Sequence, residues 1–213
     1  MNVVPAGGGE VIGDAADRRV EILCEHDAVH VTWSRMAPGR DGADLHVHRR
    51  HHDLFYVLEG ELTLKLGAGE ESRAPAGSVV CVPPLVVHGF RNASDSRELR
   101  YLNFHAPGVG FADYMRGLRD GVKVVYDQEA PPATGTRPAS EIRLGPPPLE
   151  IEAITVSERP GGGTSQRLEA YFVLDGELRV DGAIARPGAW VQIPPGVPHA
   201  LSGDARFVHV SAG

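Results

Sequence analysis

Three histidines and an aspartate in the first half of the chain have the residue types and spacing of a metal site. His46 and His48 are two residues apart, so on an extended strand both side chains point to the same face. Asp53 opens the following apolar run, and His88 opens a later one after a turn. Imidazole and carboxylate groups converging from several strands suit one divalent transition metal ion, Fe, Mn, Ni, Co or Zn. One or two coordination positions would stay open, as catalysis at a metal requires.

Other polar residues near this group have more than one interpretation. Arg49 and Arg50 are predicted to form a solvated turn, with attraction of an anionic substrate as the alternative. His51 is predicted as a turn or mouth residue. His105 is predicted to lie on the surface at a strand end, and its alternative role is a proton shuttle.

Three apolar residues are predicted to form the walls of a substrate pocket around the ion. Phe55 and Val57 share strand parity with Asp53, and Phe90 shares it with His88. The predicted ligand of this pocket is a small organic molecule.

The bulk composition excludes some partners. A net charge of −7 argues against a general nucleic-acid binder, whose binding surface would be basic. No run reaches the roughly 18 apolar residues of a membrane span. Residues 1–10 carry no secretory signal pattern, and Cys24 and Cys81 are expected to be free buried thiols. We therefore expect a cytoplasmic protein without nucleic-acid or membrane partners.

The chain contains an internal repeat. The segment that begins at Phe55 reappears at Tyr171, an offset of 116 residues. A second pair of segments, which begin at Gly77 and Gly188, is related by an offset of 111 residues. The change of five residues falls where a surface hairpin would tolerate it. The repeat predicts two homologous β domains.

Strand patterns and turn residues support this organisation. Strands are expected at Val29–Trp33, Leu54–Leu58, Leu62–Leu66, Val79–Val82 and Leu99–Phe104. One helix is expected at Phe111–Arg119, where an apolar stripe recurs at helical spacing and Gly121 can end the helix. That stripe is predicted to serve packing.

The expected domain limits follow from the proline content. Residues 1–126 are predicted to form the N-terminal barrel, and the proline-rich residues 127–148 a linker or edge strand. Residues 149–213 are predicted to form a smaller C-terminal barrel, with Ile151, Ile154 and Val156 in its first strand. About 65 residues are few for a barrel, so it is expected to lean on the first domain or on another subunit.

The spaced motifs resemble those of the cupin superfamily. Its first motif is matched by His46, His48, Asp53 and Gly60, although Arg40 stands where the motif has its leading glycine. Its second motif is matched by Gly77, Pro83, His88 and Asn92, with Leu85 in place of the inner glycine. The resemblance implies an all-β chain of two tandem jelly-roll barrels with one short helix between them, and metal at His46, His48, Asp53 and His88.

Asp53 departs from the family, which has glutamate at this position. Asp is one methylene shorter, so its carboxylate reaches less far toward the ion. His52 is therefore kept as an alternative fourth ligand, although strand parity turns His52 and Asp53 to opposite faces.

The second domain is predicted to lack a full metal site. Gly162 and Thr164 correspond to His46 and His48, while Glu169 and His199 remain at the positions of the other ligands. Glu169 and His199 are expected either to hydrogen-bond to each other or to line a small ligand pocket.

Two-domain cupins of the quercetinase type share this plan, and the resemblance suggests a metal-dependent oxygenase of the dioxygenase type. Asp53 would then act as both ligand and base. The alternatives are a non-redox metal-dependent isomerase or lyase and a non-catalytic small-ligand or metal sensor. A homodimer is also expected from the resemblance.

Overall fold

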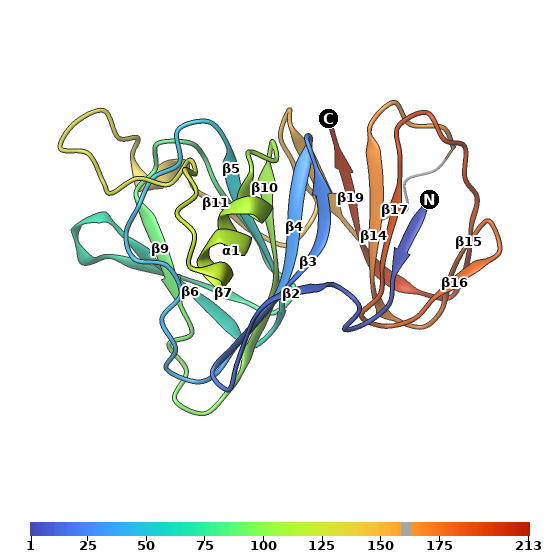
Figure 1. The fold of residues 1–213 in the computed structure, drawn as a ribbon, viewed down its shortest axis with the longest axis horizontal. Coiled ribbons are helices and arrows are strands. Elements are labelled where there is room, and N and C mark those ends of the chain that lie inside the picture. Colours follow the sequence, from blue (N-terminus) through green and yellow to red (C-terminus); the bar gives the residue numbers. More distant parts are fainter. Residues whose placement is uncertain (159–162) are drawn as a thin grey trace. The chain divides into compact units, whose positions relative to one another are not determined.

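The computed structural model describes residues 1–158 and 163–213, which form two compact units. The first barrel is Val11–Pro146, and the second barrel is Met1–Glu10 together with Pro147–Gly213. Each unit consists of two antiparallel sheets, which confirms the all-β prediction of two tandem barrels (Figure 1). Among the described residues, no helix has the length and apolar character needed to cross a bilayer.

The first barrel pairs a seven-stranded sheet with a three-stranded sheet. The larger sheet has the order β11-β8-β5-β10-β4-β3-β2, and the smaller has the order β7-β6-β9. The strand bounds of the larger sheet are β2 Glu10–Ala15, β3 Arg18–His26, β4 Val29–Met36, β5 His52–Glu59, β8 Val79–Val82, β10 Leu99–Ala106 and β11 Arg143–Gly145. Those of the smaller sheet are β6 Glu61–Leu66, β7 Glu71–Pro75 and β9 His88–Arg91.

The second barrel pairs a six-stranded sheet with a three-stranded sheet, in the orders β1-β17-β14-β19-β13-β12 and β16-β15-β18. The larger sheet comprises β1 Asn2–Val4, β12 Leu149–Glu150, β13 Ile154–Ser157, β14 Leu168–Asp175, β17 Trp190–Ile193 and β19 Arg206–Ala212. The smaller sheet comprises β15 Leu178–Val180, β16 Ala183–Ala185 and β18 Leu201–Gly203.

The sequence repeat is a structural repeat. Strand β5 lies between β10 and β8, and β14 lies between β19 and β17 in the same arrangement. Gly60 and Gly176 end these two strands with positive φ angles of 79° and 72°. A side chain at Gly60 would also collide with the backbone oxygen of Glu98. The glycine that closes the first motif is therefore required by backbone geometry.

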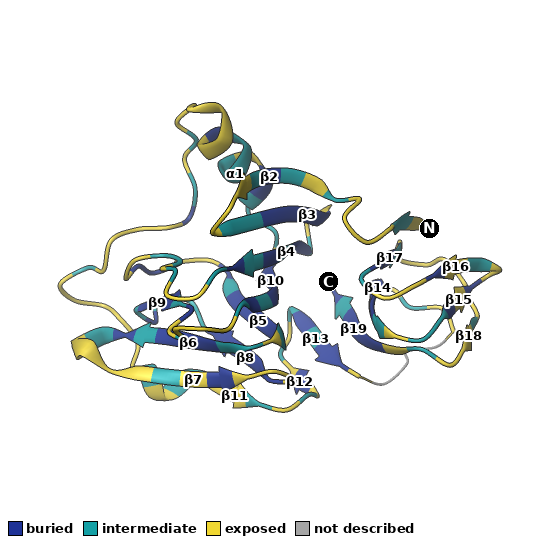
Figure 2. Cartoon of the chain, turned by 90° about the horizontal axis from the view of Figure 1, so that it is seen from below, coloured by how far each residue is buried: buried dark blue, intermediate teal, exposed yellow. Residues whose placement is uncertain are grey.

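The predicted strands of the first barrel all lie within observed strands, and most of their side chains are buried. The predicted helix is α1, Phe111–Asp120, which ends at Gly121 in the left-handed conformation. Two short 3-10 helices, η1 Gly67–Gly69 and η2 Ala139–Glu141, were not predicted. Strands β5, β8 and β10 of the first barrel consist mainly of buried residues, which are dark blue in Figure 2.

The unit limits differ from the expected domain limits at two places. Residues 1–10, expected in the first barrel, belong to the second, where β1 pairs with β17. Residues 127–146, expected to link the domains, belong to the first barrel, where β11 forms an edge strand on β8. Ile154 and Val156 lie in β13, whereas Ile151 lies outside any strand. The chain's own N-terminus thus extends the small second barrel.

Val3 tests the contribution of the N-terminus to the second barrel, because it packs against the core of this unit. Val3→Asp should lower the free energy of unfolding of the second barrel by about 1–2 kcal/mol, since a charge would enter a partly apolar site. Urea unfolding followed by the fluorescence of buried Trp190, in a Trp33→Phe background, measures this. Asn2→Asp on the exposed face of β1 is the matched control. Equal unfolding midpoints for both variants would contradict the assignment.

Candidate metal centre

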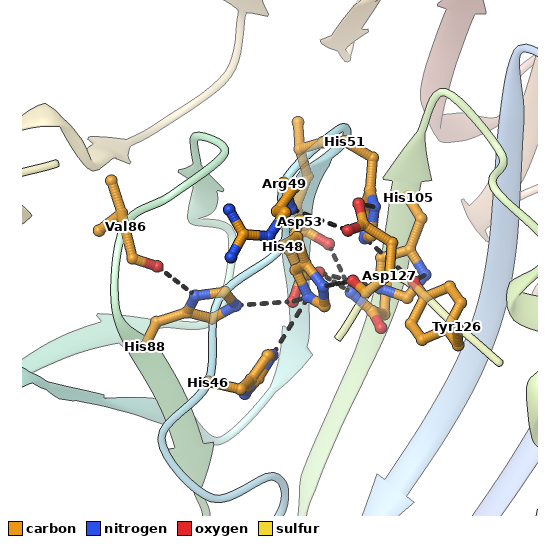
Figure 3. Close-up of polar contacts among 12 residues, drawn as sticks. His46, His48, Arg49, His51, Asp53, Val86, His88, His105, Tyr126 and Asp127 are labelled. Carbon is orange, nitrogen blue, oxygen red and sulfur yellow. Dashed lines mark hydrogen bonds and ion pairs between the residues drawn. The ribbon is translucent and has the colours of Figure 1, made fainter. Parts of the chain in front are cut away.

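The four predicted ligands come from three segments of the first barrel that the fold brings together. His46 and His48 lie in the extended segment before β5, Asp53 lies on β5 and His88 opens β9. The backbones of His46 and His88 are joined by two hydrogen bonds of 2.8 and 3.0 Å. One nitrogen or oxygen atom from each of the four side chains lies within 4.8 Å of the others, and all four residues are buried (Figure 3).

Each of the three imidazoles is oriented by a backbone carbonyl. The Nδ1 of His46 faces the Asp44 oxygen at 2.7 Å, and that of His88 faces the Val86 oxygen at 2.9 Å. The Nδ1 of His48 faces the backbone oxygen of Asp127. A carbonyl oxygen only accepts hydrogen bonds, so each Nδ1 carries the proton and each Nε2 keeps its lone pair. This is the tautomer that a metal ligand requires.

The spacing of these lone pairs fits a shared cation. Two ligand atoms about 2.1 Å from one ion, at angles of 90° to 109°, lie roughly 3.0–3.4 Å apart. The Nε2 atoms of His46 and His48 are 3.1 Å apart, and His88 Nε2 is 3.2 Å from Asp53 Oδ2. His48 Nε2 is 3.8 Å from the same oxygen. Two buried lone pairs facing each other at 3.1 Å repel, and a cation between them removes the repulsion.

The protonation of the site supports the same conclusion. Burial and the neighbouring imidazoles of His88 and His48 lower the pKa of His46 to about 3, so its ring is neutral at pH 7. Burial alone would raise the pKa of Asp53, but the charge and hydrogen bond of His105 outweigh it and hold that pKa well below its usual value. A carboxylate that stays ionised binds a cation well and takes up a proton poorly. These electrostatics favour Asp53 as a ligand over its predicted role as a base.

Two side chains of β10 complete the surroundings of Asp53. The Asn103 amide donates to Asp53 Oδ1, and His105 Nε2 lies 3.3 Å from the same oxygen. Asp53 Oδ2 is left facing the histidine cluster. His105 is therefore buried in the site, and the prediction of a surface histidine is wrong. Asn103 was not predicted, because only the pairing of β10 with β5 brings it to Asp53.

Asp127 holds the histidine segment from outside the cluster. Its carboxylate accepts the backbone N–H groups of Arg49 and Arg50 at 3.0 and 2.8 Å, and the Nδ1–H of His51 at 3.0 Å. Its backbone oxygen orients His48. Sequence reasoning missed Asp127, because nothing local signals a contact between residues nearly 80 positions apart.

His51 belongs to a second group of converging imidazoles, with His48 and His105. The Tyr126 hydroxyl lies 3.0 Å from His51 Nε2 and 3.3 Å from His105 Nδ1. Because Asp127 and Asp53 lie at the other nitrogens of these two rings, every ring nitrogen of His51 and His105 faces a polar partner. His51 is fully buried and orients its neighbours, whereas it was predicted at a turn or mouth.

His52, the alternative ligand, is not among the side chains that converge on the centre. It is half-buried, and it precedes Asp53 on β5, so its side chain leaves the opposite face of the sheet. The geometry brings Asp53 to the histidines and does not bring His52.

A cavity of about 250 Å³ adjoins the cluster and includes His46, His48, Asp53 and His105 in its lining. Of the predicted walls, Phe90 lines this cavity. Phe55 and Val57 do not, because both are fully buried in the core, where Phe55 packs against Phe90. The residues of α1 that were predicted to serve packing also line the cavity: Phe111, Tyr114, Met115 and Leu118.

Comparison with known proteins agrees with this geometry. A family model of the cupin domain matches residues 32–105, which include all four candidate ligands. This part of the first barrel is therefore similar to the cupin domain family. Over 120 residues it is 30% identical to quercetin 2,3-dioxygenase of Bacillus subtilis (strain 168), a match that covers 55% of this chain and 34% of that enzyme. The chain therefore spans about a third of the length of this curated relative.

Two solved structures have the same fold over nearly the whole chain. A bacterial pirin of Escherichia coli, solved in complex with nickel(II), has a TM-score of 0.68 at 13% identity and covers 99% of this chain and 98% of its own. Oxalate decarboxylase of B. subtilis has a TM-score of 0.58 at 12% identity and covers 99% and 76%. At such low identity these likenesses concern the cupin fold alone.

The second barrel has different polar contacts at the corresponding positions. Glu169 binds His209 and Ser211 of β19, and His199 Nε2 lies 3.1 Å from the Tyr171 hydroxyl. The expected hydrogen bond between Glu169 and His199 does not form. Among the described residues of this barrel, no three histidine, cysteine or carboxylate side chains converge. Gly162, the counterpart of His46, lies outside the described residues.

Asp127→Ala tests the outer contacts of the metal centre. Loss of three hydrogen bonds to the histidine segment should weaken metal binding about 10- to 100-fold, since ligands that are not held in place bind more weakly. Competition for Zn²⁺ against a chelating dye measures this affinity. Glu129→Gln in the same segment removes only an exposed ion pair with Arg49 and should leave the affinity unchanged. An affinity of Asp127→Ala equal to that of the unchanged protein would contradict the positioning role.

Proposed function

We propose that the first barrel is a metal-dependent oxygenase of the dioxygenase type that acts on a small organic substrate. The observation that carries the proposal is the convergence of three lone-pair nitrogens and one ionised carboxylate at the wall of a cavity. Similarity to quercetin 2,3-dioxygenase over 120 residues favours an oxygenase over other metal-dependent chemistry.

The residues of the chain fit a resident divalent metal. His46, His48, Asp53 and His88 would hold it, and the ion would polarise a substrate oxygen and supply the redox chemistry that O2 requires. Asn103 and His105 keep the Asp53 carboxylate ionised and directed at the histidines. The ring of His46 is neutral and carries its proton on Nδ1, away from the ligand position.

The Tyr126 hydroxyl joins two buried histidines beside the centre. It lies 3.0 Å from His51 Nε2 and 3.3 Å from His105 Nδ1, and its single proton can be donated to either ring. Because burial raises the pKa of Tyr126, the phenol keeps that proton. His105 lines the cavity, and its alternative role as a proton shuttle stays a prediction.

The paired replacement His46→Ala and His48→Ala tests the proposal. The protein purified without a tag or added metal should contain close to one ion per chain and should consume O2 with a suitable substrate. The variant should lose both, because two of the four ligands are gone. Elemental analysis and an oxygen electrode measure the two properties, with quercetin and small aromatic hydroxy acids as trial substrates.

His52→Ala is the matched control, because it removes a neighbouring imidazole that does not converge on the centre. It should keep both metal and O2 consumption. Metal content unchanged by loss of His46 and His48 would overturn the proposed site. Substrate turnover without O2 consumption would replace the oxygenase by the non-redox isomerase or lyase.

A further inference from the structure

The cavity beside the metal centre contains an arginine, Arg18, that forms no ion pair with any described residue. Among the described lining residues, Arg18 is the one arginine or lysine and Asp53 the one carboxylate. Arg18 begins β3, is half-buried and has a buried Nε atom without a hydrogen-bond acceptor. Within the described part of the chain, no carboxylate forms an ion pair with it. Its neighbour Arg19 is different, because it binds Asp14 and Glu21 at 2.8 and 2.7 Å.

The charge of Arg18 acts inside the cavity. Burial raises the pKa of the Tyr101 phenol, and the positive charge of Arg18 opposes this rise, so the guanidinium lies near a residue that also lines the cavity. A guanidinium that is partly removed from water without a counterion is unfavourable, and an anion bound beside it offsets that cost. Arginine binds carboxylates in a planar, two-point geometry.

The remainder of the cavity gives the shape and polarity of the ligand. A divalent ion with one carboxylate and neutral imidazoles leaves a charge of about +1, and Arg18 adds another. Phe90 and Phe111 supply aromatic walls, and Met115 and Leu118 add apolar ones. A volume of about 250 Å³ is below the roughly 300–1,000 Å³ typical of drug-sized ligands, so it suits a molecule with about one ring.

We propose that this cavity binds a small aromatic carboxylate, with the carboxylate paired to the Arg18 guanidinium and the ring against the apolar walls. A ring oxygen would then face the metal centre, and this part of the proposal rests on the proposed function. The anion contact does not rest on it. Arg49, one of the two arginines that the sequence suggested for anion attraction, is exposed and already bound to Glu129 at 2.7 Å.

Calorimetric titration with 2-hydroxybenzoate and its neutral amide tests the charge recognition. The protein is used as its redox-silent zinc form and in the metal-free state. Arg18→Gln should raise the Kd for the carboxylate about 10- to 100-fold, the range expected for a charge-assisted hydrogen bond, and leave the Kd for the amide unchanged. Arg18→Lys should recover part of the affinity, because it keeps the charge but loses the two-point geometry.

Arg49→Gln is the matched control, because it removes the same charge outside the cavity, and its carboxylate Kd should stay within about two-fold. Equal effects of the two glutamine variants would overturn the proposal, since the effect would then come from net charge. Equal binding of carboxylate and amide by the unchanged protein, or no binding of the carboxylate, would overturn it as well. Carboxylate binding that depends on Arg18 in a protein unable to bind zinc would support the inference while the proposed metal function fails.

Discussion

The site depends on the hydrogen bonds that the Nδ1–H groups of His46, His48 and His88 donate. Each is directed at a backbone carbonyl, of Asp44, Val86 or Asp127, so the Nε2 lone pairs of three buried rings meet at one point. Lone pairs held 3.1 Å apart repel unless a cation lies between them. The barrel backbone thus prepares a position for a positive charge, and the choice of tautomer is fixed before any ion arrives.

Because the ligand side chains must be held in place, many neighbouring groups hydrogen-bond to Asp53 and to the segment that carries His48. A carboxylate surrounded by imidazoles stays ionised only if donors outweigh its loss of hydration, and Asn103 and His105 supply them to Asp53. The segment that carries His48 and His51 is irregular, so its backbone N–H groups need acceptors, and the Asp127 carboxylate provides them. Polar networks of this kind are stable only when every member is paired.

The two barrels share their strand arrangement but differ in the residues at the positions of the candidate ligands. Strands β5 and β14 have matching partners and end at equivalent glycines with positive φ, because these features maintain the sheets. In the second barrel Glu169, at the position equivalent to Asp53, accepts hydrogen bonds from His209 and Ser211. Glu169 is therefore neutralised by neighbouring side chains, where Asp53 is left open toward a cluster of lone pairs.

Local patterns were enough to predict the fold class, the repeat, the main strands of the first barrel, helix α1 and the four residues that converge at the centre. Periodicity and motif spacing are local properties, and strand parity separated Asp53 from His52. Other features became visible only in the folded chain: Asp127, Asn103 and His105 surround the centre, residues 1–10 join the second barrel, and Arg18 and α1 line the cavity. Phe55 and Val57, expected at the pocket wall, lie in the core instead. These outcomes depend on pairings between segments far apart in the chain, for which a local pattern carries no information.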